Sequence, residues 1–326
     1  MINNFYKGER NQMSYIIAIG AYLVLLMIYG LVIAHKKVKT TDDMMTGGHK
    51  IPFIILVGSL LATWCGGGGI TGSAGVVYSG GPWVGALAYA APPIGIILLY
   101  FIAGRVRKTN KVTVPEIMGA RYGAAASVIS ALCVMLAYVG VLATQLKAAA
   151  DILVLLCHSS NIEMSHGTAL PICTIIVLII TVGGGLVSVA YSDAVSALIM
   201  IGGFFLAIPI LVHVANSQGA VLPPEKASFT GGLSGWTLLG YFLPGLSLML
   251  GDQNMLQRFA SAKNSDEAKK SNIGMFIGEL LVIISIIALV TQAAKLYPSL
   301  DTPSNVIFQV AVDYLPLVFG ALVMCA

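Results

Sequence analysis

Long apolar stretches, separated by short polar or Gly- and Pro-marked breaks, recur along the 326 residues of this chain. A helix needs about 20 mostly apolar residues to cross roughly 30 Å of hydrocarbon. Nine stretches qualify: 14–34, 52–78, 83–104, 124–157, 169–190, 193–214, 236–259, 272–296 and 306–326. The alternating polarity of membrane β-barrel strands does not occur. We therefore expect an all-α, polytopic membrane helix bundle with a single transmembrane domain over residues 1–326.

The composition agrees with a bilayer environment. Hydrophobic residues make up 57% of the chain and charged residues 10%, with a mean hydropathy of +0.87, whereas about 25% of residues are charged in ordinary globular proteins. A soluble domain is thereby excluded, and the lipid bilayer is the expected solvent of the chain. The net charge of +4 at pH 7 is explained by topology rather than by nucleic-acid binding.

Lys and Arg residues concentrate in alternate loops, which indicates how the chain is oriented. If the N-terminus lies outside, the inner loops hold thirteen of the 18 basic residues: Lys36, Lys37, Lys39, Lys50, Arg105, Arg107, Lys108, Lys111, Arg121, Arg258, Lys263, Lys269 and Lys270. The first stretch is too long for a signal peptide, so an uncleaved helix is expected. We expect a multi-pass protein of the plasma (cell inner) membrane with its N-terminus outside.

Four consecutive glycines interrupt the second stretch at residues 66–69. Each glycine costs about 1 kcal/mol relative to alanine inside a helix, so the run favours unwound backbone at mid-membrane depth. Such backbone persists only where protein buries it or where it lines a water-filled cavity. Transporters use broken helices of this kind to bind ions and substrates. Close helix packing through Gly68 and Gly72, a GxxxG pair, is the alternative.

Polar residues also interrupt the seventh stretch, at Asp252, Gln253 and Asn254. A carboxylate and two amides inside a span are costly unless they face a cavity or a partner, which makes them candidate site residues. The alternative is that Asp252 lies near the cytoplasmic end and is hydrated or paired with Arg258. Two interrupted helices, one early and one five spans later, are what an inverted-repeat carrier places at its central site.

Four motifs follow one another at matching topological positions. They are Ala-Thr-Trp at 62–64 with Gly-Ser-Ala at 72–74, Thr-Val-Pro-Glu at 113–116 with Arg-Tyr-Gly at 121–123, the segment 184–193, and Gln-Arg at 257–258 with Ser-Ala-Lys at 261–263. With these motifs the sequence resembles the sodium/solute symporter family over residues 13–326, and within it the choline-transporting branch and its prokaryotic relatives.

The resemblance implies a fold and a coupling ion. The fold would be the inverted-repeat (LeuT-like) transporter fold, in which a leading helix precedes two five-helix repeats around a midplane site, worked by alternating access. The coupling ion would be Na⁺, bound by the backbone carbonyls of Ala62 and Cys65 in the broken helix. Asp193 matches an aspartate on the inner sodium exit path, and a helix-start cap is the alternative for it.

The resemblance also implies a substrate site. Trp64 and Tyr138 match aromatic residues that surround choline, so cation–π contacts with the solute are conceivable. The other substrate-binding candidates come from the two interrupted helices, and they are Gly66, Gly67, Asp252, Gln253 and Asn254.

Two departures from the family pattern bear on these assignments. Residues 251–254 read Gly-Asp-Gln-Asn where choline-transporting members carry a further tryptophan, so the aromatic cage is incomplete. The family's other sodium ligands are hydroxyl residues on the ninth helix, shortly after a stretch that residues 315–322 match, and the sequence ends at Ala326. We therefore expect a chain truncated within the ninth span, with an incomplete second repeat, whose full activity needs residues beyond 326.

Charged residues within other spans leave more than one interpretation open. Lys147 and Asp151 are four residues apart on one predicted helix, so they form either a neutralised pair or a site where Lys147 contacts a substrate carboxylate. Asp252 instead favours a cationic or polar neutral solute. Glu279 is either a coupling carboxylate or a member of a snorkelling or interhelix contact.

Sodium-coupled symport of a small organic solute is the function that these patterns predict, with Na⁺ as the coupling ion and no enzymatic activity. The sequence around Ser234 mimics the GxSG of an intramembrane protease, but it falls in an outer loop without a membrane-embedded histidine to activate the serine. A membrane pore, or a non-transporting membrane protein that binds a partner through the same helices, is the alternative.

Overall fold

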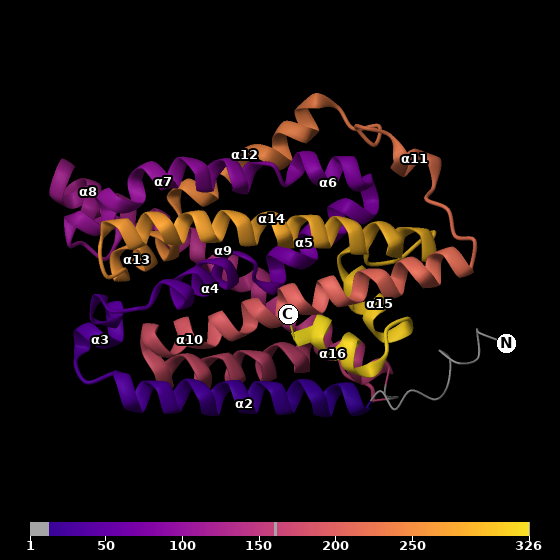
Figure 1. Ribbon diagram of the computed structural model, residues 1–326, viewed down its shortest axis with the longest axis horizontal. Helices are drawn as coiled ribbons and strands as arrows, with labels where there is room; N and C mark the ends of the chain where they lie inside the picture. The colour runs from indigo at the N-terminus through magenta and orange to yellow at the C-terminus, as the bar shows by residue number, and fades with distance from the viewer. Residues whose placement is uncertain (1–12, 160–161, 326) are drawn as a thin grey trace.

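The computed structural model describes residues 13–159 and 162–325, and over these residues it is helical apart from one isolated bridge between Ile51 and Ala262. The helices are α2 (Met13–Lys37), α3 (Thr41–Thr46), η1 (Gly47–His49), α4 (Phe53–Trp64), α5 (Gly67–Gly80), α6 (Pro82–Ala88), α7 (Ala91–Thr109), α8 (Val114–Tyr122), α9 (Ala124–Ser159), α10 (His166–Ser217), α11 (Pro224–Ala227), α12 (Gly235–Gly251), α13 (Gln253–Ser261), α14 (Ser265–Leu296), η2 (Pro303–Asn305), α15 (Val306–Asp313) and α16 (Leu317–Cys325). The long helices lie roughly side by side along the horizontal axis of Figure 1.

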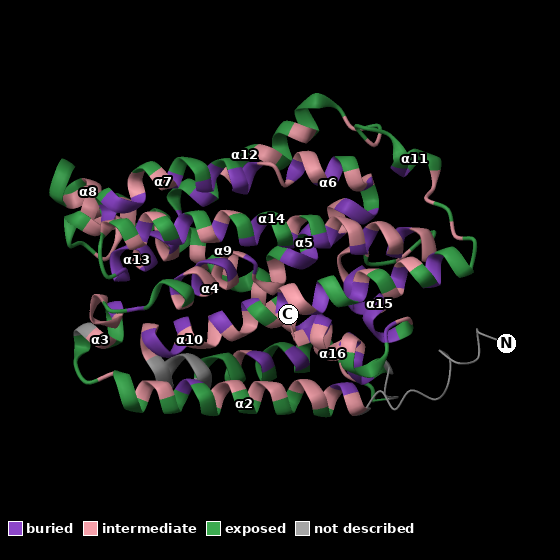
Figure 2. Ribbon diagram, viewed as in Figure 1, coloured by how far each residue is buried: buried purple, intermediate pink, exposed green. Residues whose placement is uncertain are grey.

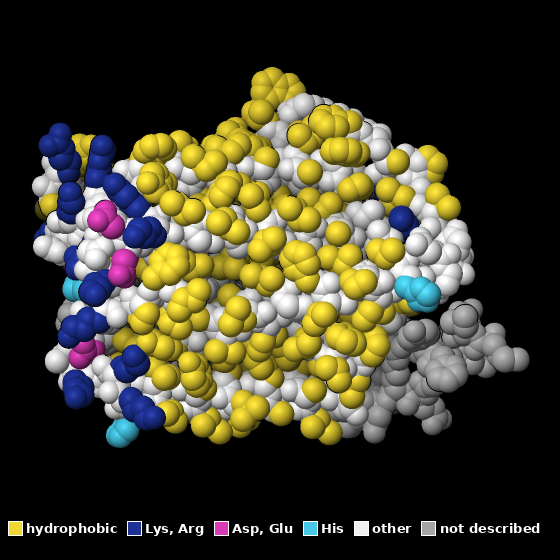
Figure 3. All heavy atoms as spheres, in the orientation of Figure 1, with side chains coloured by type: hydrophobic (Ala, Val, Ile, Leu, Met, Phe, Trp, Pro, Cys, Tyr) yellow, Lys and Arg dark blue, Asp and Glu magenta, His cyan; other side chains and the backbone are white. Residues whose placement is uncertain are grey.

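The long helices form a bundle with the surface of a membrane protein. In the described part of the chain, five helices are long and apolar enough to cross a bilayer, and the bent pair α4 and α5 makes a sixth. Apolar side chains cover the middle of the face in Figure 3, whereas Lys and Arg gather at the end that carries α3, α8 and α13. The outward faces of α2, α7 and α12 are largely exposed in Figure 2, as expected for lipid contact.

The second apolar stretch is broken where the glycine run predicts. α4 ends at Trp64 and α5 begins at Gly67, and the two axes differ by 57°. Close helix packing, the alternative explanation for Gly68 and Gly72, applies to Gly68 only. A side chain at Gly68 would meet the Thr144 backbone at 3.1 Å, whereas one at Gly72 would meet nothing within 4 Å.

The boundary between the fifth and sixth stretches differs from the expected one at residues 191–192. The structure bends inside α10 at Gly185, whose φ of 60° and ψ of −175° are readily accessible only to glycine. A Cβ there would also lie 2.7 Å from Met44 Cγ of α3. Asp193 therefore lies within a helix, and the interpretation of Asp193 as a helix-start cap is wrong.

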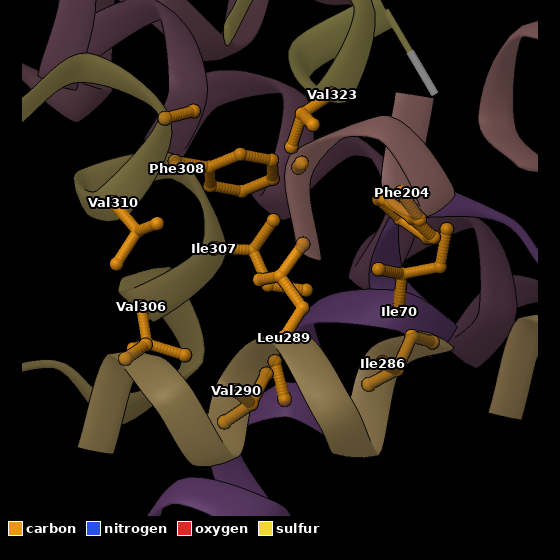
Figure 4. Packing of buried hydrophobic residues seen from close by; sticks show 14 of the residues in the cluster. Ile70, Phe204, Ile286, Leu289, Val290, Val306, Ile307, Phe308, Val310 and Val323 are labelled. Carbon is orange, nitrogen blue, oxygen red and sulfur yellow. The ribbon is translucent and has the colours of Figure 1, made fainter. Parts of the chain in front are cut away.

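The expected ninth span, 306–326, is also wrong as a single helix over its described residues. It forms two helices, α15 and α16, separated at Tyr314–Pro316. Pro316 lacks the N–H that a continuous helix needs. α15 is buried rather than exposed to lipid, and Figure 4 shows Val306 and Ile307 beside Leu289 and Val290 of α14.

Short helices at the basic end carry strong N-terminal caps. Thr40 and Thr113 each accept a hydrogen bond from the N–H three residues later, at Asp43 and Glu116, whose carboxylates accept in return from the cap residue. The hydrogen bond from the Thr40 hydroxyl contributes most to lowering the pKa of Asp43 below its usual range. The motif at 113–116 therefore serves to begin α8, with Pro115 in its first turn.

Candidate functional site

A cavity of about 350 Å³ lies between the two broken helices. Its walls come from α4, α5, α7, α9, α12, α13 and α14. Its lining includes Thr63, Trp64, Cys65, Gly68, Gly69, Gly72, Ser73, Tyr89, Tyr138, Thr144, Gln145, Tyr241, Leu248, Asp252, Asn254, Glu279 and Ile286. Both breaks therefore open on one space, which is large enough for a small organic molecule.

The break between α4 and α5 leaves several backbone groups outside the helical hydrogen-bond ladder. The last bond of α4 runs from the Cys65 N–H to the Leu61 carbonyl, and the first of α5 runs from the Ile70 N–H to the Gly66 carbonyl. The carbonyl oxygens of residues 62–65 therefore have no i+4 backbone donor recorded in the described chain. Ala62 and Cys65, the predicted sodium ligands, belong to this group.

Gln145 of α9 holds the unwound segment in place. Its Oε1 accepts a hydrogen bond of 2.9 Å from the Gly68 N–H. A Cβ on Gly66 would lie 2.3 Å from Gln145 Nε2, so a larger residue there would displace the Gln145 amide. Sequence reasoning overlooked Gln145, although a polar amide inside an apolar span is itself a signal of function.

Glu279 of α14 is buried at the edge of this break. Its Oε1 accepts a hydrogen bond of 3.1 Å from Trp64 Nε1, and its Oε2 accepts one of 3.0 Å from Cys65 Sγ. Only 3% of the residue is exposed. Glu279 thus makes an interhelix contact and does not snorkel, and it lines the cavity as well.

The second break is at Asp252, between α12 and α13. Asp252 caps α13, because its Oδ1 accepts a hydrogen bond of 2.8 Å from the Met255 N–H. The Tyr138 hydroxyl accepts one of 3.1 Å from the Asn254 N–H and also interacts with the Asp252 carboxylate. Asp252 is only 9% exposed. It is therefore not simply hydrated.

Arg258 forms its ion pair with Asp193 rather than with Asp252. Arg258 Nη2 lies 3.1 Å from Asp193 Oδ2. The Ser59 hydroxyl joins them, since it accepts from Arg258 Nε at 2.8 Å and donates to Asp193 Oδ2 at 2.8 Å. This network links α4, α10 and α13 on the side of the cavity toward the basic end.

The remaining predicted site residues lie around the cavity rather than on it. Gly66 and Gly67 belong to the break but do not line the cavity. The Gln253 amide binds the loop before α8, because Oε1 accepts from the Val114 N–H at 2.6 Å and Nε2 donates to the Val112 carbonyl at 3.2 Å. The structure therefore gives Gln253 a role in positioning the loop.

Lys147 is paired rather than directed at the cavity. Its Nζ lies 2.7 Å from Asp151 Oδ2, and His166 Nε2 lies 2.8 Å from the other oxygen of Asp151. The Lys147 side chain is 67% exposed and does not line the cavity, which confirms the neutralised pair. Ser234 caps α12 by accepting a hydrogen bond from the Thr237 N–H.

Two interrupted membrane helices that open on one cavity are the hallmark of a secondary carrier built from inverted repeats. The comparison of sequences indicates the same class of protein, because the sodium:solute symporter family matches residues 44–323. The chain belongs to the sodium:solute symporter family, which is a family of transporters rather than enzymes.

Curated relatives in this family include choline and sialic acid carriers. The chain is 25% identical to the high-affinity choline transporter 1 of Drosophila melanogaster, over 91% of this chain and 48% of that protein. It is 26% identical to the human high-affinity choline transporter 1, over 82% and 48%. It is 24% identical to the sodium/sialic acid symporter NanT of Aliivibrio fischeri, over 79% and 52%. The chain thus spans about half the length of these relatives.

A solved structure shares the fold. A Na⁺-coupled sialic acid symporter, in a substrate-bound outward-open state, matches with a TM-score of 0.77 and 17% identity over 96% of this chain and 68% of that one. This confirms the inverted-repeat fold. Helix α2 precedes the broken helix α4–α5, and the broken helix α12–α13 follows later in the chain.

Proposed function

We propose that this chain, which spans about half the length of its curated relatives, forms part of a carrier that performs sodium-coupled symport of a small organic solute by alternating access. The observation that supports this most directly is that the bent pair α4–α5 and the break at Asp252 between α12 and α13 open on one cavity of about 350 Å³. Trp64, Tyr138, Asp252 and Asn254 would contact the solute there. Gly66, Gly67 and Gln253 would act indirectly, through the shape of the two breaks.

Sodium would bind at the first break. The carbonyl oxygens of Ala62 and Cys65 lie where the helical ladder is interrupted, and hard cations prefer such oxygen ligands. Bound Na⁺ would stabilise the outward-open state, in which the solute enters before the two broken helices close around it. Asp193, which interacts with Thr63 in the last turn of α4, would lie on the path by which the ion leaves toward the inside.

The orientation in the membrane follows from charge. The end of the bundle that carries α3, α8 and α13 is rich in Lys and Arg (Figure 3). Cytoplasmic loops carry such an excess. We therefore place this end in the cytoplasm and the N-terminus outside, in the plasma (cell inner) membrane.

Uptake into proteoliposomes tests the proposal. A version of the chain extended to the full length of the carrier is purified and reconstituted, and accumulation of labelled solutes is compared under an inward Na⁺ gradient and an equal K⁺ gradient. We expect accumulation only with Na⁺ and its loss when a Na⁺ ionophore collapses the gradient. Uptake that ignores the Na⁺ gradient would refute coupling. Ion conductance without solute would favour a pore.

A further inference from the structure

The described lining of the cavity includes acidic residues but no basic ones. Two of its lining residues, Asp252 and Glu279, are acidic, and among the described residues that line it none is Lys, Arg or His. We propose that the transported solute is an organic cation and that Glu279 is its counter-ion. This inference rests on the proposed function and specifies its substrate class.

Glu279 has hydrogen-bond partners but no charge partner. The indole N–H of Trp64 and the thiol of Cys65 occupy its two oxygens, and both donors are neutral. No ion pair of Glu279 is recorded within the described ranges 13–159 and 162–325. A buried carboxylate is costly to ionise without a cation beside it. A cationic solute in the cavity would supply that partner.

The nearby basic residues are already committed. Arg258 interacts electrostatically with Asp252, but its guanidinium is paired with Asp193 and does not line the cavity. Lys147 is paired with Asp151. The N-terminus of α5 offers only about half a positive charge. Even with that contribution, the acidic groups around the cavity outnumber the basic ones, which disfavours an anionic solute.

Aromatic walls complete a cation site. Trp64, Tyr89, Tyr138 and Tyr241 line the cavity together with Glu279. The faces of such rings attract ammonium groups, and they do so more strongly where water is excluded. The rings by themselves would suit either a cationic or a neutral amphipathic solute. The buried carboxylate is what discriminates between them.

Fluorescence of Trp64 provides a direct test with the purified chain. The chain has three tryptophans, and Trp83 and Trp236 are 53% and 84% exposed and lie outside the cavity. The double variant Trp83→Phe/Trp236→Phe therefore leaves Trp64 as the only reporter. In saturating Na⁺, it is titrated with choline, protonated dimethylethanolamine, the uncharged choline isostere 3,3-dimethylbutan-1-ol, and sialate.

We expect both cations to bind at least about tenfold more tightly than the neutral isostere, and sialate not to bind. In the same background, Glu279→Gln should weaken cation binding by about 10- to 100-fold, the range for loss of a charge-assisted contact, and should change binding of the isostere less than about twofold. Asp266→Asn, which removes an exposed carboxylate from the first turn of the same helix, is the matched control and should change neither. Failure of both cations to bind, equal binding of the isostere, or an unchanged Glu279→Gln titration would overturn the proposal.

Three further outcomes separate this inference from the proposed function. If Na⁺ alone shifts Trp64 fluorescence, and Glu279→Gln abolishes that shift while leaving cation affinity intact, then Glu279 binds the coupling ion and not the solute. If Na⁺-driven uptake is found for a neutral or anionic solute only, symport stands and the cationic substrate class falls. If cations bind as expected but uptake ignores Na⁺, the substrate class stands and coupling falls.

Discussion

Replacement of Arg258 by methionine should destabilise the folded chain by about 3–5 kcal/mol, the cost of breaking a buried ion pair by removing one partner. Arg258 is 5% exposed, and its guanidinium pairs with Asp193 and donates hydrogen bonds to the Ser59 hydroxyl and, at 3.5 Å, to the Asn254 carbonyl. Each contact with a charged group contributes about 1.5–3 kcal/mol. Methionine keeps the length and apolar stem of arginine, so the loss reports the charge rather than a cavity.

A double-mutant cycle isolates the pair. Arg258→Met, Asp193→Asn and the combined variant are unfolded by denaturant in detergent micelles, and free energies are taken by linear extrapolation. The combined variant should lose about 2 kcal/mol less than the two single losses added together, because no buried charge then remains unpaired. As a control, Lys147→Met removes a 67%-exposed member of an ion pair and should cost at most about 1 kcal/mol. A loss below about 1 kcal/mol for Arg258→Met, or purely additive effects, would refute the reasoning.

Substitutions of Gly66 and Gln253 test the two helix breaks. Gly66→Ala should lower the melting temperature and weaken solute binding, because the new methyl group would displace Gln145 at a cost of about 1–2 kcal/mol for the lost hydrogen bond. As the control, Gly72→Ala places its methyl group in open space and should leave the melting temperature unchanged or raise it. An equal loss of stability in both variants would contradict this role of Gly66. Gln253→Ala should lose about 1–2 kcal/mol of stability through its contacts with the loop at Val114 while leaving solute affinity unchanged; a tenfold fall in affinity at unchanged stability would make Gln253 a solute contact instead.

The two helix breaks could be predicted from the sequence because their causes are local. Consecutive glycines at 66–69 make helix costly wherever the chain folds, and Asp252 favours a cap over a helix interior. The same local reasoning placed the next bend at 191–192 instead of at Gly185, because three consecutive glycines at 183–185 do not by themselves indicate which one bends. In the described structure Gly185 lies close to Met44 of α3, which leaves no room for a side chain at this position. It also passed over Pro316, since the residues on either side are apolar enough to resemble one span.

The partners of the polar groups could not be predicted, because they lie far apart in the sequence. Arg258 is six residues from Asp252, yet it pairs with Asp193, which α10 brings beside α13. The sequence leaves several interpretations of Glu279 open, because Trp64 and Cys65, at the end of α4, are brought against it only by folding. Periodicity and spacing define which helices exist. Which side chains meet in the cavity depends on how those helices pack.

Coupling between Na⁺ and the solute is the central claim, and reciprocal binding measures it most directly. The affinity of the purified chain for a bound organic cation is measured across a series of Na⁺ concentrations, and the affinity for Na⁺ is measured across a series of solute concentrations. Thermodynamic linkage requires that each ligand raise the affinity for the other by the same factor, typically about 5- to 150-fold. We predict equal factors in that range, and their loss when the first break is closed by substitution of its glycines. Solute affinity that is the same in Na⁺ and in K⁺ would contradict the account.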